Sequence, residues 1–206
     1  MSPKPTVFVV DDDAAVRDGL ALLLDTAGLA VETYDGAAAF LATCSAGRAG
    51  CLILDVRMPE MSGPELQAEL IRRGVDLPII FLTAHGDIPT TVQAMKAGAM
   101  DFLTKPVVGD ELLDRVRAAF EKSARLREQA TARESLRERL QGLTGRERQI
   151  MKLVADGLPN KEIARSLGIS HRTVEVHRAR VMQKTGVTNL VELSRLAQAC
   201  GLLGGS

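Results

Sequence analysis

The chain has 206 residues, with 46% apolar residues, 25% charged residues and a formal net charge of +0. This suits a globular protein with one large domain, or one of about 120 residues plus a smaller one. The longest apolar runs fall well short of the ~20 residues of a membrane-spanning helix, no leader peptide is visible, and three cysteines without CxxC spacing (Cys44, Cys51 and Cys200) are expected to be reduced.

The two ends of the chain differ in charge. Residues 1–120 contain 10 Lys/Arg against 17 Asp/Glu, whereas residues 143–206 contain 10 against 5. Residues 121–142 lie between them with 6 against 4. An acidic first part and a basic last part indicate two modules with different partners, and the basic one is a candidate for binding nucleic acid.

Short apolar segments alternate with amphipathic segments over residues 1–120. Five βα units in series predict a parallel sheet with helices on both faces. We therefore expect an α/β doubly wound five-stranded parallel sheet. The predicted strands are Thr6–Val10, Ala30–Tyr34, Cys51–Asp55, Pro78–Thr83 and Asp101–Thr104, and the predicted helices are Ala14–Ala27, Gly36–Thr43, Gly63–Arg73, Pro89–Ala97 and one that begins near Gly109.

The segment Asp110–Gln141 contains neither proline nor glycine and is rich in Glu, Arg, Ala and Leu. It predicts one long helix, whose later part (residues 121–142) is a helical linker. Polar residues such as Ser123 and Arg133 interrupt any coiled-coil seam. We favour a linker helix that pairs with its twin, and a flexible tether is the alternative.

Four short helices are predicted over residues 143–206. Each begins at a residue type that caps helices, and the first begins with a Thr-x-x-Glu capping box. Together they predict a small all-α four-helix domain. The expected caps are Thr144 (with Glu147), Asn160, Ser170 and Asn189, and the expected ends lie near Asp156, Leu167, Thr185 and Cys200.

Acidic side chains stand at the ends of two predicted strands. Asp11–Asp13 follow the first strand, and Asp55 ends the third. Since the carboxyl ends of parallel strands meet at one edge of the sheet, these carboxylates should converge. Their mutual repulsion favours a hard divalent cation with oxygen ligands, and Mg²⁺ fits with one or two carboxylates plus waters.

A hydroxyl and an ammonium group are expected at the same edge, because Thr83 ends the fourth strand and Lys105 follows the fifth. Such a set suits phosphoryl transfer to a carboxylate, which needs a nucleophile, a metal and donors for the phosphoryl oxygens. Singly, Asp11–Asp13 also suit a helix cap and Lys105 a solvated surface charge. Their joint position at strand ends favours a functional site.

The segments VVDDD, LDVRMPEMSG, FLTAHGD and FLTKP, in this order and spacing, resemble the signatures of two-component receiver domains over residues 1–120. The resemblance implies a sheet of flavodoxin-like order and a cis peptide between Lys105 and Pro106. It also implies that phosphorylation reshapes the face built from the fourth helix, the fifth strand and the fifth helix. The implied roles are Asp55 as phosphoacceptor, Asp11 and Asp12 with Asp55 and the main-chain carbonyl of Arg57 as the Mg²⁺ site, Thr83 and Lys105 as phosphoryl-binding residues, and Phe102 as the switch aromatic. One departure is Val107, where close relatives often carry an aromatic residue.

The parts TGRE, NKEIA, LGIS and TVEVHRARVMQK resemble the LuxR-type helix-turn-helix over most of residues 143–199. With the receiver-like part, the whole chain resembles response regulators of the FixJ/NarL class, closest to the FixJ-like branch. The resemblance implies a transcription regulator that is not an enzyme, and the cysteines expected to be reduced indicate the cytoplasm. It also implies a sensor histidine kinase as phosphodonor, a double-stranded DNA operator, RNA polymerase as a further partner and a homodimer on phosphorylation.

Helical geometry assigns the faces of the helix that follows Ser170. Val174, His177 and Val181 share one face, which should pack on the bundle. The opposite face carries small and polar residues framed by arginines and suits a DNA major groove. The residues expected near bases are Arg172, Glu175, Val176, Ala179, Arg180 and Gln183, and those expected at phosphates are Lys161, Thr173, Arg178 and Lys184.

Two details of this domain stay open. Glu175 either accepts a hydrogen bond from a cytosine amino group or pairs locally with Arg172 or Arg178. The apolar residues of the last helix exceed what a small core needs and suggest a dimer contact. They are Leu190, Leu193, Leu196 and Ala197.

Two alternative functions use the same residues differently. A phosphatase of the haloacid-dehalogenase type would also use Asp55 as nucleophile, but such sites usually carry an aspartate two positions later, where this chain has Arg57. The other alternative is a receiver that serves only as a dimerisation scaffold, with phosphorylation irrelevant to DNA binding.

Overall fold

The computed structural model describes residues 4–45, 47–84 and 88–199. The chain forms two compact units, Met1–Glu128 and Gln129–Ser206. The division between them lies inside the segment expected to be a linker. Each unit is described by itself.

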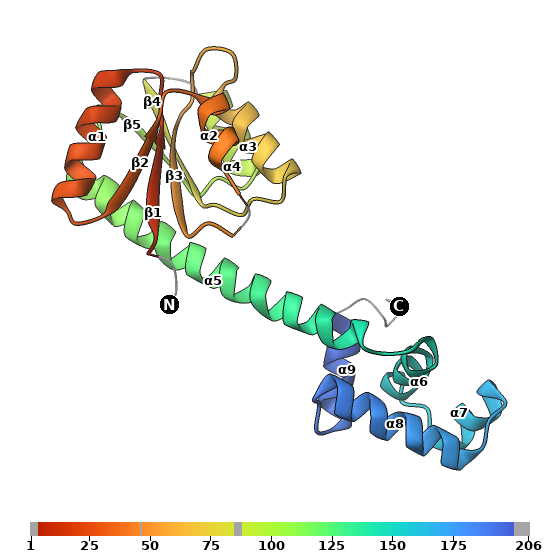
Figure 1. Ribbon diagram of the computed structural model, residues 1–206. Helices are drawn as coiled ribbons and strands as arrows, with labels where there is room; N and C mark the ends of the chain where they lie inside the picture. Colours follow the sequence, from red (N-terminus) through yellow and green to blue (C-terminus); the bar gives the residue numbers. More distant parts are fainter. Residues whose placement is uncertain (1–3, 46, 85–87, 200–206) are drawn as a thin grey trace. The chain divides into compact units, whose positions relative to one another are not determined.

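The N-terminal unit contains a five-stranded parallel sheet of order β2-β1-β3-β4-β5, as predicted (Figure 1). Strand and helix bounds agree with the expected ones to within one residue at most ends. The strands are β1 Thr6–Val10, β2 Ala30–Tyr34, β3 Gly50–Asp55, β4 Ile79–Ala84 and β5 Asp101–Lys105, and the helices are α1 Ala14–Thr26, α2 Ala37–Thr43, α3 Gly63–Arg72, α4 Ile88–Lys96 and α5 Gly109–Gln141.

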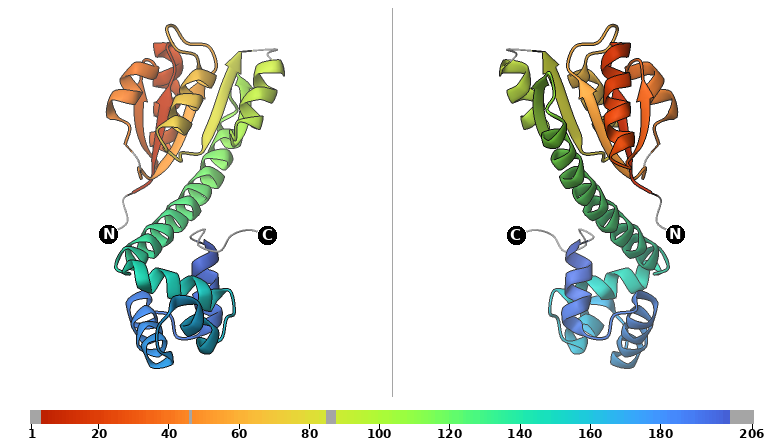
Figure 2. Two further views of the ribbon diagram at one scale, coloured as in Figure 1. Left: turned by 90° about the vertical axis from the view of Figure 1, so that its right-hand side faces the viewer. Right: turned by 90° about the vertical axis from the view of Figure 1, so that its left-hand side faces the viewer.

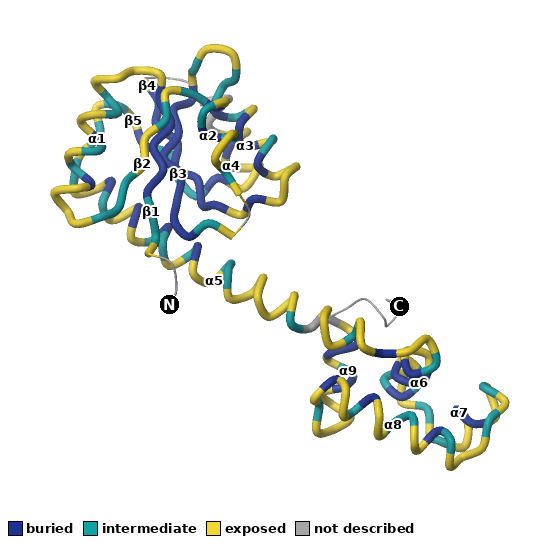
Figure 3. The backbone as a smooth tube through the Cα atoms, viewed as in Figure 1, coloured by how far each residue is buried: buried dark blue, intermediate teal, exposed yellow. Residues whose placement is uncertain are grey.

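Both faces of the sheet are covered by helices, as Figure 2 shows from two sides. Because successive side chains of a strand point to opposite faces, the apolar runs of β1, β3 and β4 divide between two cores. One core packs against α2, α3 and α4 and contains Phe8, Leu52 and Phe81. The other packs against α1 and α5 and contains Val9 and Ile53. The three inner strands are therefore buried almost throughout (Figure 3).

Helix α5 is continuous over Gly109–Gln141, so the predicted long helix is confirmed and the flexible tether is not observed. Its first turns are buried against the sheet through Leu112, Val116 and Ala119. Ser123, which in the sequence only interrupted a seam, is buried and its Oγ accepts a hydrogen bond from the main-chain N–H of Gly50 at 3.2 Å. Residues 128–134 of the helix are exposed (Figure 3).

Gly50 is required where α5 meets the start of β3. Its φ is 144°, and a Cβ at this position would lie 1.8 Å from the main-chain oxygen of Thr6. No side chain fits that space. The first residue of β3 is therefore fixed by its close approach to β1 and by the Ser123 hydroxyl.

The C-terminal unit is a small helical bundle, as predicted. Thr144 and Ser170 cap their helices, and the capping box of Thr144 with Glu147 is present. Asn160 does not cap: it is the first residue of its helix and Pro159 holds the cap position, so that prediction is wrong. The helices are α6 Gly145–Ala155, α7 Asn160–Leu167, α8 His171–Thr185 and α9 Leu190–Ala199.

The last helix contributes more to the core than expected. Leu193, Leu196 and Ala197 are buried among side chains of α6, α7 and α8. Only Leu190, 44% exposed, remains at the surface among the four residues assigned to a dimer contact. The apolar surplus predicted on this helix is thus mostly core, because a bundle of short helices needs all of these contacts to close.

The cysteine prediction holds for the described residues. Cys51 is buried, Cys44 is half-buried and neither forms a disulfide, while Cys200 lies outside the described residues. Burial raises the pKa of the Cys51 thiol to about 12. Among the residues that the structure describes, no helix has the length and apolar character to cross a membrane.

Replacing Ser123 with alanine should destabilise the N-terminal unit. The main-chain N–H of Gly50 would stay buried without a partner, which costs about 1–3 kcal/mol of unfolding free energy. Denaturant unfolding of the full chain measures this loss. Thr131→Ala, at an exposed position of the same helix, is the control, and an equal loss in both variants would contradict the role of the hydroxyl.

Candidate functional site

Two carboxylates and one ammonium group converge at the carboxyl ends of the strands, where the site was predicted. Lys105 Nζ lies 2.6 Å from Asp11 Oδ2 and 2.5 Å from Asp55 Oδ1. Asp11 is 1% exposed and Asp55 6% exposed, while Lys105 is partly exposed. The ammonium therefore bridges two nearly buried carboxylates that come from different strands.

The sheet order explains why a lysine fills this place. Asp55 ends β3 and Lys105 ends β5, with β4 between them. Two strand spacings amount to about 10 Å, so only a long side chain from β5 can reach across the end of β4. Asp11 follows β1, which is the neighbour of β3 on its other side.

Burial and charge oppose each other at this site. Burial raises the pKa of the Asp55 carboxyl above its ordinary value, and the neighbouring Asp11 adds to the rise, although the Lys105 ammonium and the N–H of Arg57 act against it. For Lys105, burial lowers the pKa, but the hydrogen bonds to Asp11 and Asp55 outweigh it and the pKa lies above its ordinary value. The lysine therefore stays charged, and with both carboxylates ionised the trio carries one net negative charge.

Thr83 lies on β4, the neighbour of β3, and Phe102 lies on β5, one strand further from Asp55. Thr83 is 3% exposed, and its hydroxyl donates to the main-chain oxygen of Ala84 at 3.1 Å. The Phe102 ring is half-buried, with its centroid 6.1 Å from that of Phe81. The expected cis peptide between Lys105 and Pro106 is present.

Val107, where an aromatic residue is common in the family, is half-buried and packs against the core under α1 and α5. The substitution therefore keeps apolar contact beneath the fifth helix.

The three consecutive aspartates have three different environments. Asp11 points into the site, where its Oδ1 accepts the N–H of Asp13 at 3.0 Å. Asp12 is exposed. Asp13 caps α1 by accepting the N–H of Ala15 at 2.8 Å, so the helix-cap reading holds for this one residue.

The donor set fits a magnesium ion in part. Asp11 and Asp55 lie close enough for both carboxylates to bond to the Lys105 ammonium, and Mg²⁺ needs only one or two carboxylates besides water. Within the described residues, no group of three or more His, Cys, Asp or Glu side chains is arranged to hold a metal. The structure thus brings Asp11 and Asp55 together, whereas Asp12 does not complete a cluster with them. Arg57 is exposed, and its main-chain N–H donates to Asp55 Oδ2 at 2.6 Å.

The start of α3 is built closely against the end of β3. Gly63 donates its N–H to the main-chain oxygen of Val56 at 3.0 Å. A Cβ on Gly63 would lie 2.3 Å from the main-chain oxygen of Asp55 and 2.9 Å from the Phe81 ring. The glycine in the segment LDVRMPEMSG is therefore needed to hold the helix behind Asp55.

Sequence reasoning missed Arg17 as a part of this site. Its Nη1 donates to the main-chain oxygen of Asp11 at 2.7 Å. Arg17 lies six residues after Asp11, at the end of the first turn of α1, where a side chain can fold back onto the end of β1. The six-residue spacing between Asp11 and Arg17 is the feature of the sequence from which this contact could have been predicted.

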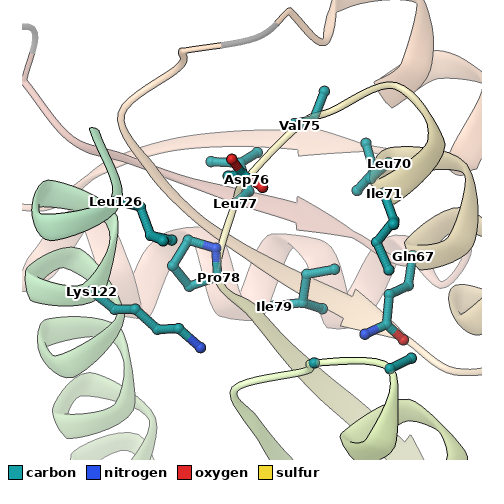
Figure 4. Close-up of a pocket in the computed structure, with 12 residues that line it drawn as sticks. Gln67, Leu70, Ile71, Val75, Asp76, Leu77, Pro78, Ile79, Lys122 and Leu126 are labelled. Atoms are coloured by element: carbon teal, nitrogen blue, oxygen red, sulfur yellow. The ribbon is translucent and has the colours of Figure 1, made fainter. Parts of the chain in front are cut away.

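A pocket of about 190 Å³ lies at the opposite end of β4 from the acidic pair (Figure 4). Leu70, Leu77 and Pro78 form apolar parts of its wall, and Lys122 and Leu126 of α5 close one side. None of the predicted site residues lines it. The pocket is therefore separate from the predicted chemistry.

Helix α8 shows the two faces that its sequence predicted. Val174 and Val181 are buried, and His177 is half-buried. Nδ1 of His177 is buried without a hydrogen-bond partner, which suits a packed histidine. The residues expected near bases are exposed, namely Arg172, Glu175, Val176, Ala179, Arg180 and Gln183.

Two of the four residues expected at phosphates are bonded to neighbouring helices. Lys184 Nζ lies 2.7 Å from Glu147 Oε2, and Glu147 is almost fully buried. Arg178 Nη1 donates to Asn160 Oδ1 at the start of α7. Lys161 is exposed, and Thr173 is partly exposed with its main-chain N–H bonded to Ser170.

Glu175 pairs with neither Arg172 nor Arg178. Its Oε1 lies 3.5 Å from His171 Nδ1, and both side chains are 56% exposed. The local pairing with Arg172 or Arg178 that the sequence left open is therefore not formed, and the nearest basic side chain is that of His171.

The chain matches two protein families. Residues 7–117 match the family described as "Response regulator receiver domain", and residues 141–197 match "Bacterial regulatory proteins, luxR family".

Similar proteins share nearly the whole chain. The "Transcriptional regulatory protein FixJ" of Azorhizobium caulinodans is 48% identical over 95% of this chain and 93% of its own length. The "Response regulator protein TodT" of Pseudomonas putida is 44% identical over 96% of this chain and 88% of its own. A solved structure of the response regulator StyR is 49% identical, with a TM-score of 0.83 over 95% of this chain and 99% of that one.

The bond between Glu147 and Lys184 should make the C-terminal unit sensitive to acid. Hydrogen bonds from Lys184 and from the N–H of Thr144 lower the pKa of Glu147 from 4.5 to about 2. A carboxyl with a lowered pKa stabilises the fold at pH values above its ordinary pKa, and this contribution is lost as the pH falls through about 2.

Thermal unfolding of the full chain between about pH 5 and pH 2 measures this loss. Glu147→Gln should remove most of the pH dependence of the C-terminal transition. Glu138→Gln, at an exposed position of α5, is the control. An unchanged pH dependence in Glu147→Gln would show that other carboxylates are responsible.

Proposed function

This chain belongs to the response regulators that combine a receiver domain with a LuxR-type DNA-binding domain, as FixJ does, and on this premise we propose that phosphorylation of Asp55 controls its pairing on DNA. The family consists of transcription regulators and not of enzymes. The observation that carries the proposal is the convergence of Asp11, Asp55 and Lys105 at the strand ends.

In the proposed reaction a carboxylate oxygen of Asp55 attacks the phosphorus of a phosphohistidine on a sensor histidine kinase. A P–O bond to Asp55 forms, the P–N bond breaks, and its electron pair stays on the histidine nitrogen. Lys105 lies within hydrogen-bond distance of Asp55 and offers its positive charge to the phosphoryl oxygens. The N–H of Arg57 and the packing of Gly63 hold the carboxylate in place.

With both carboxylates ionised, the trio of Asp11, Asp55 and Lys105 carries one net negative charge. The phosphoryl group carries about −2 but removes the single negative charge of the Asp55 carboxylate to which it bonds, so the site becomes more negative by about one charge. A bound Mg²⁺ would supply positive charge that offsets both. Asp11 and Asp55 are the side chains proposed to hold it. The exposed Asp12 and the main-chain carbonyl of Arg57 are proposed as further ligands. Because one ammonium group does not neutralise two buried carboxylates, binding of a divalent cation at this site is favourable.

Thr83 and Phe102 are proposed to pass the change to the surface. The Thr83 hydroxyl now donates to the Ala84 carbonyl and would exchange this partner for a phosphoryl oxygen. Its movement would open space for the Phe102 ring, which lies on the adjacent strand. The face made by α4, β5 and α5 would then favour a homodimer.

We assign the receiver to residues 1–120, the helical linker to 121–142 and the DNA-binding domain to 143–206. In the dimer, two copies of α8 would bind a roughly palindromic operator, with RNA polymerase as a further partner and the cytoplasm as the location. Exposed Arg172, Val176 and Gln183 are proposed to face the bases.

The first test is the oligomeric state of the purified full chain with Mg²⁺, before and after acetyl phosphate or beryllofluoride. We expect a shift from monomer to dimer in light scattering for the wild type and none for Asp55→Asn. A shift in neither protein, or an equal shift in both, would contradict control through Asp55. If both proteins shift equally and Asp55→Asn keeps full operator affinity, the receiver serves only as a dimerisation scaffold.

Thr83→Ala should separate phosphorylation from dimerisation. The variant keeps Asp55 and Lys105, so it should still accept a phosphoryl group in a phosphate-affinity gel. Its dimerisation constant should fall by about tenfold or more, which corresponds to one lost hydrogen bond to a charged group. Thr33→Ala, at an exposed position of β2 on the opposite edge of the sheet, is the control. Wild-type dimerisation of phosphorylated Thr83→Ala would exclude this hydroxyl from the switch.

A further inference from the structure

Asn160 links the first helix of the helix-turn-helix to the recognition helix α8. It is the first residue of α7, and it leaves the cap position to Pro159. Its Oδ1 accepts a hydrogen bond from Arg178 Nη1. An asparagine at the start of a helix usually accepts hydrogen bonds from the N–H groups of that helix. The side chain of Asn160 instead accepts from Arg178 of α8, which points to a different role.

Arg178 lies beside the buried stripe of α8. At about 100° per residue, Arg178 and Lys184 fall on opposite sides of the stripe formed by Val174 and Val181. Arg178 is half-buried and faces α7, whereas Lys184 is bonded to Glu147 of α6. Each side of the recognition helix is thus bonded to a neighbouring helix by one basic side chain, Arg178 to α7 and Lys184 to α6.

The bond from Lys184 to Glu147 and the bond from Arg178 to Asn160 leave different charges at the surface. The carboxylate of Glu147 neutralises Lys184 at 2.7 Å. Asn160 is a neutral acceptor, so Arg178 keeps its full positive charge and the other N–H groups of its guanidinium. A phosphate needs a charged donor, and a guanidinium already held on one side loses less freedom when it binds one.

We infer that Arg178 contacts a DNA phosphate, that Asn160 is the residue that positions it, and that Lys184 is withdrawn from the DNA interface by Glu147. The inference rests on DNA binding by the C-terminal domain. It separates the basic residues expected at phosphates from the sequence. Lys161 and Arg178 keep an unneutralised positive charge, whereas the charge of Lys184, whose side chain is 38% exposed, is neutralised by Glu147.

The salt dependence of DNA binding distinguishes these roles. The logarithm of the affinity falls with the logarithm of the salt concentration, by about 0.9 for each phosphate contact. Full-length protein is titrated with a random-sequence duplex between about 50 and 200 mM salt, with and without beryllofluoride. Arg178→Ala and Lys161→Ala should each lower the slope by about 0.9, whereas Lys184→Met should leave it unchanged.

A double-mutant cycle tests Asn160. Asn160→Ala and Arg178→Ala should each weaken binding, and the double variant should bind no worse than Arg178→Ala alone. The coupling should be about twofold or more, as for residues in contact. Asn160→Ala with Lys161→Ala is the matched control, in which the losses should multiply. A role of Asn160 in folding alone would couple to Arg178 in thermal unfolding but not in DNA affinity.

Three results would overturn the inference. They are a drop of slope in folded Lys184→Met equal to that in Arg178→Ala, an unchanged slope in Arg178→Ala, and multiplied losses in the Asn160/Arg178 double variant. Glu147→Gln adds a test in the opposite direction, because it frees the charge of Lys184 and should raise the slope. Absence of DNA binding by the wild type would instead remove the proposed function together with the inference.

Discussion

The structure of the N-terminal unit depends on one buried charge arrangement, the ammonium of Lys105 between the carboxylates of Asp11 and Asp55. A single positive charge does not balance two nearly buried negative ones, so the site keeps an excess of negative charge. That excess favours the binding of a divalent cation, and phosphorylation makes the site more negative still. The parallel sheet makes the arrangement possible because it brings three strand ends to one edge.

The surroundings of these residues serve to hold them. Gly63 lets α3 begin directly behind Asp55, and Arg17 fixes the backbone of Asp11. At the other end of the sheet, Ser123 fastens α5 to the start of β3. Helix α5 therefore belongs to the packed N-terminal unit beyond residue 120, and its later turns are exposed.

In the C-terminal unit the recognition helix is held by charged side chains as well as by apolar packing. Its buried stripe is narrow, since only Val174, Val181 and Thr185 of this helix are buried. Bonds from Lys184 to α6 and from Arg178 to α7 restrain the helix on each side of that stripe. Basic residues on such a helix are thus divided between holding it and binding DNA, and exposure alone does not distinguish the two uses.

The sequence by itself determined the parallel sheet, the helix bounds and the strand-end position of Asp11, Asp55, Thr83 and Lys105, because these follow from local periodicity and from the rules of parallel sheets. The order of the strands came from the resemblance to receiver domains. Tertiary structure decided which polar groups are paired. Asn160 bonds to α8 and does not cap its own helix, Lys184 bonds to Glu147, and most of the apolar surplus of α9 is core. Partners distant along the chain leave no periodic signal, so only the folded arrangement determines them.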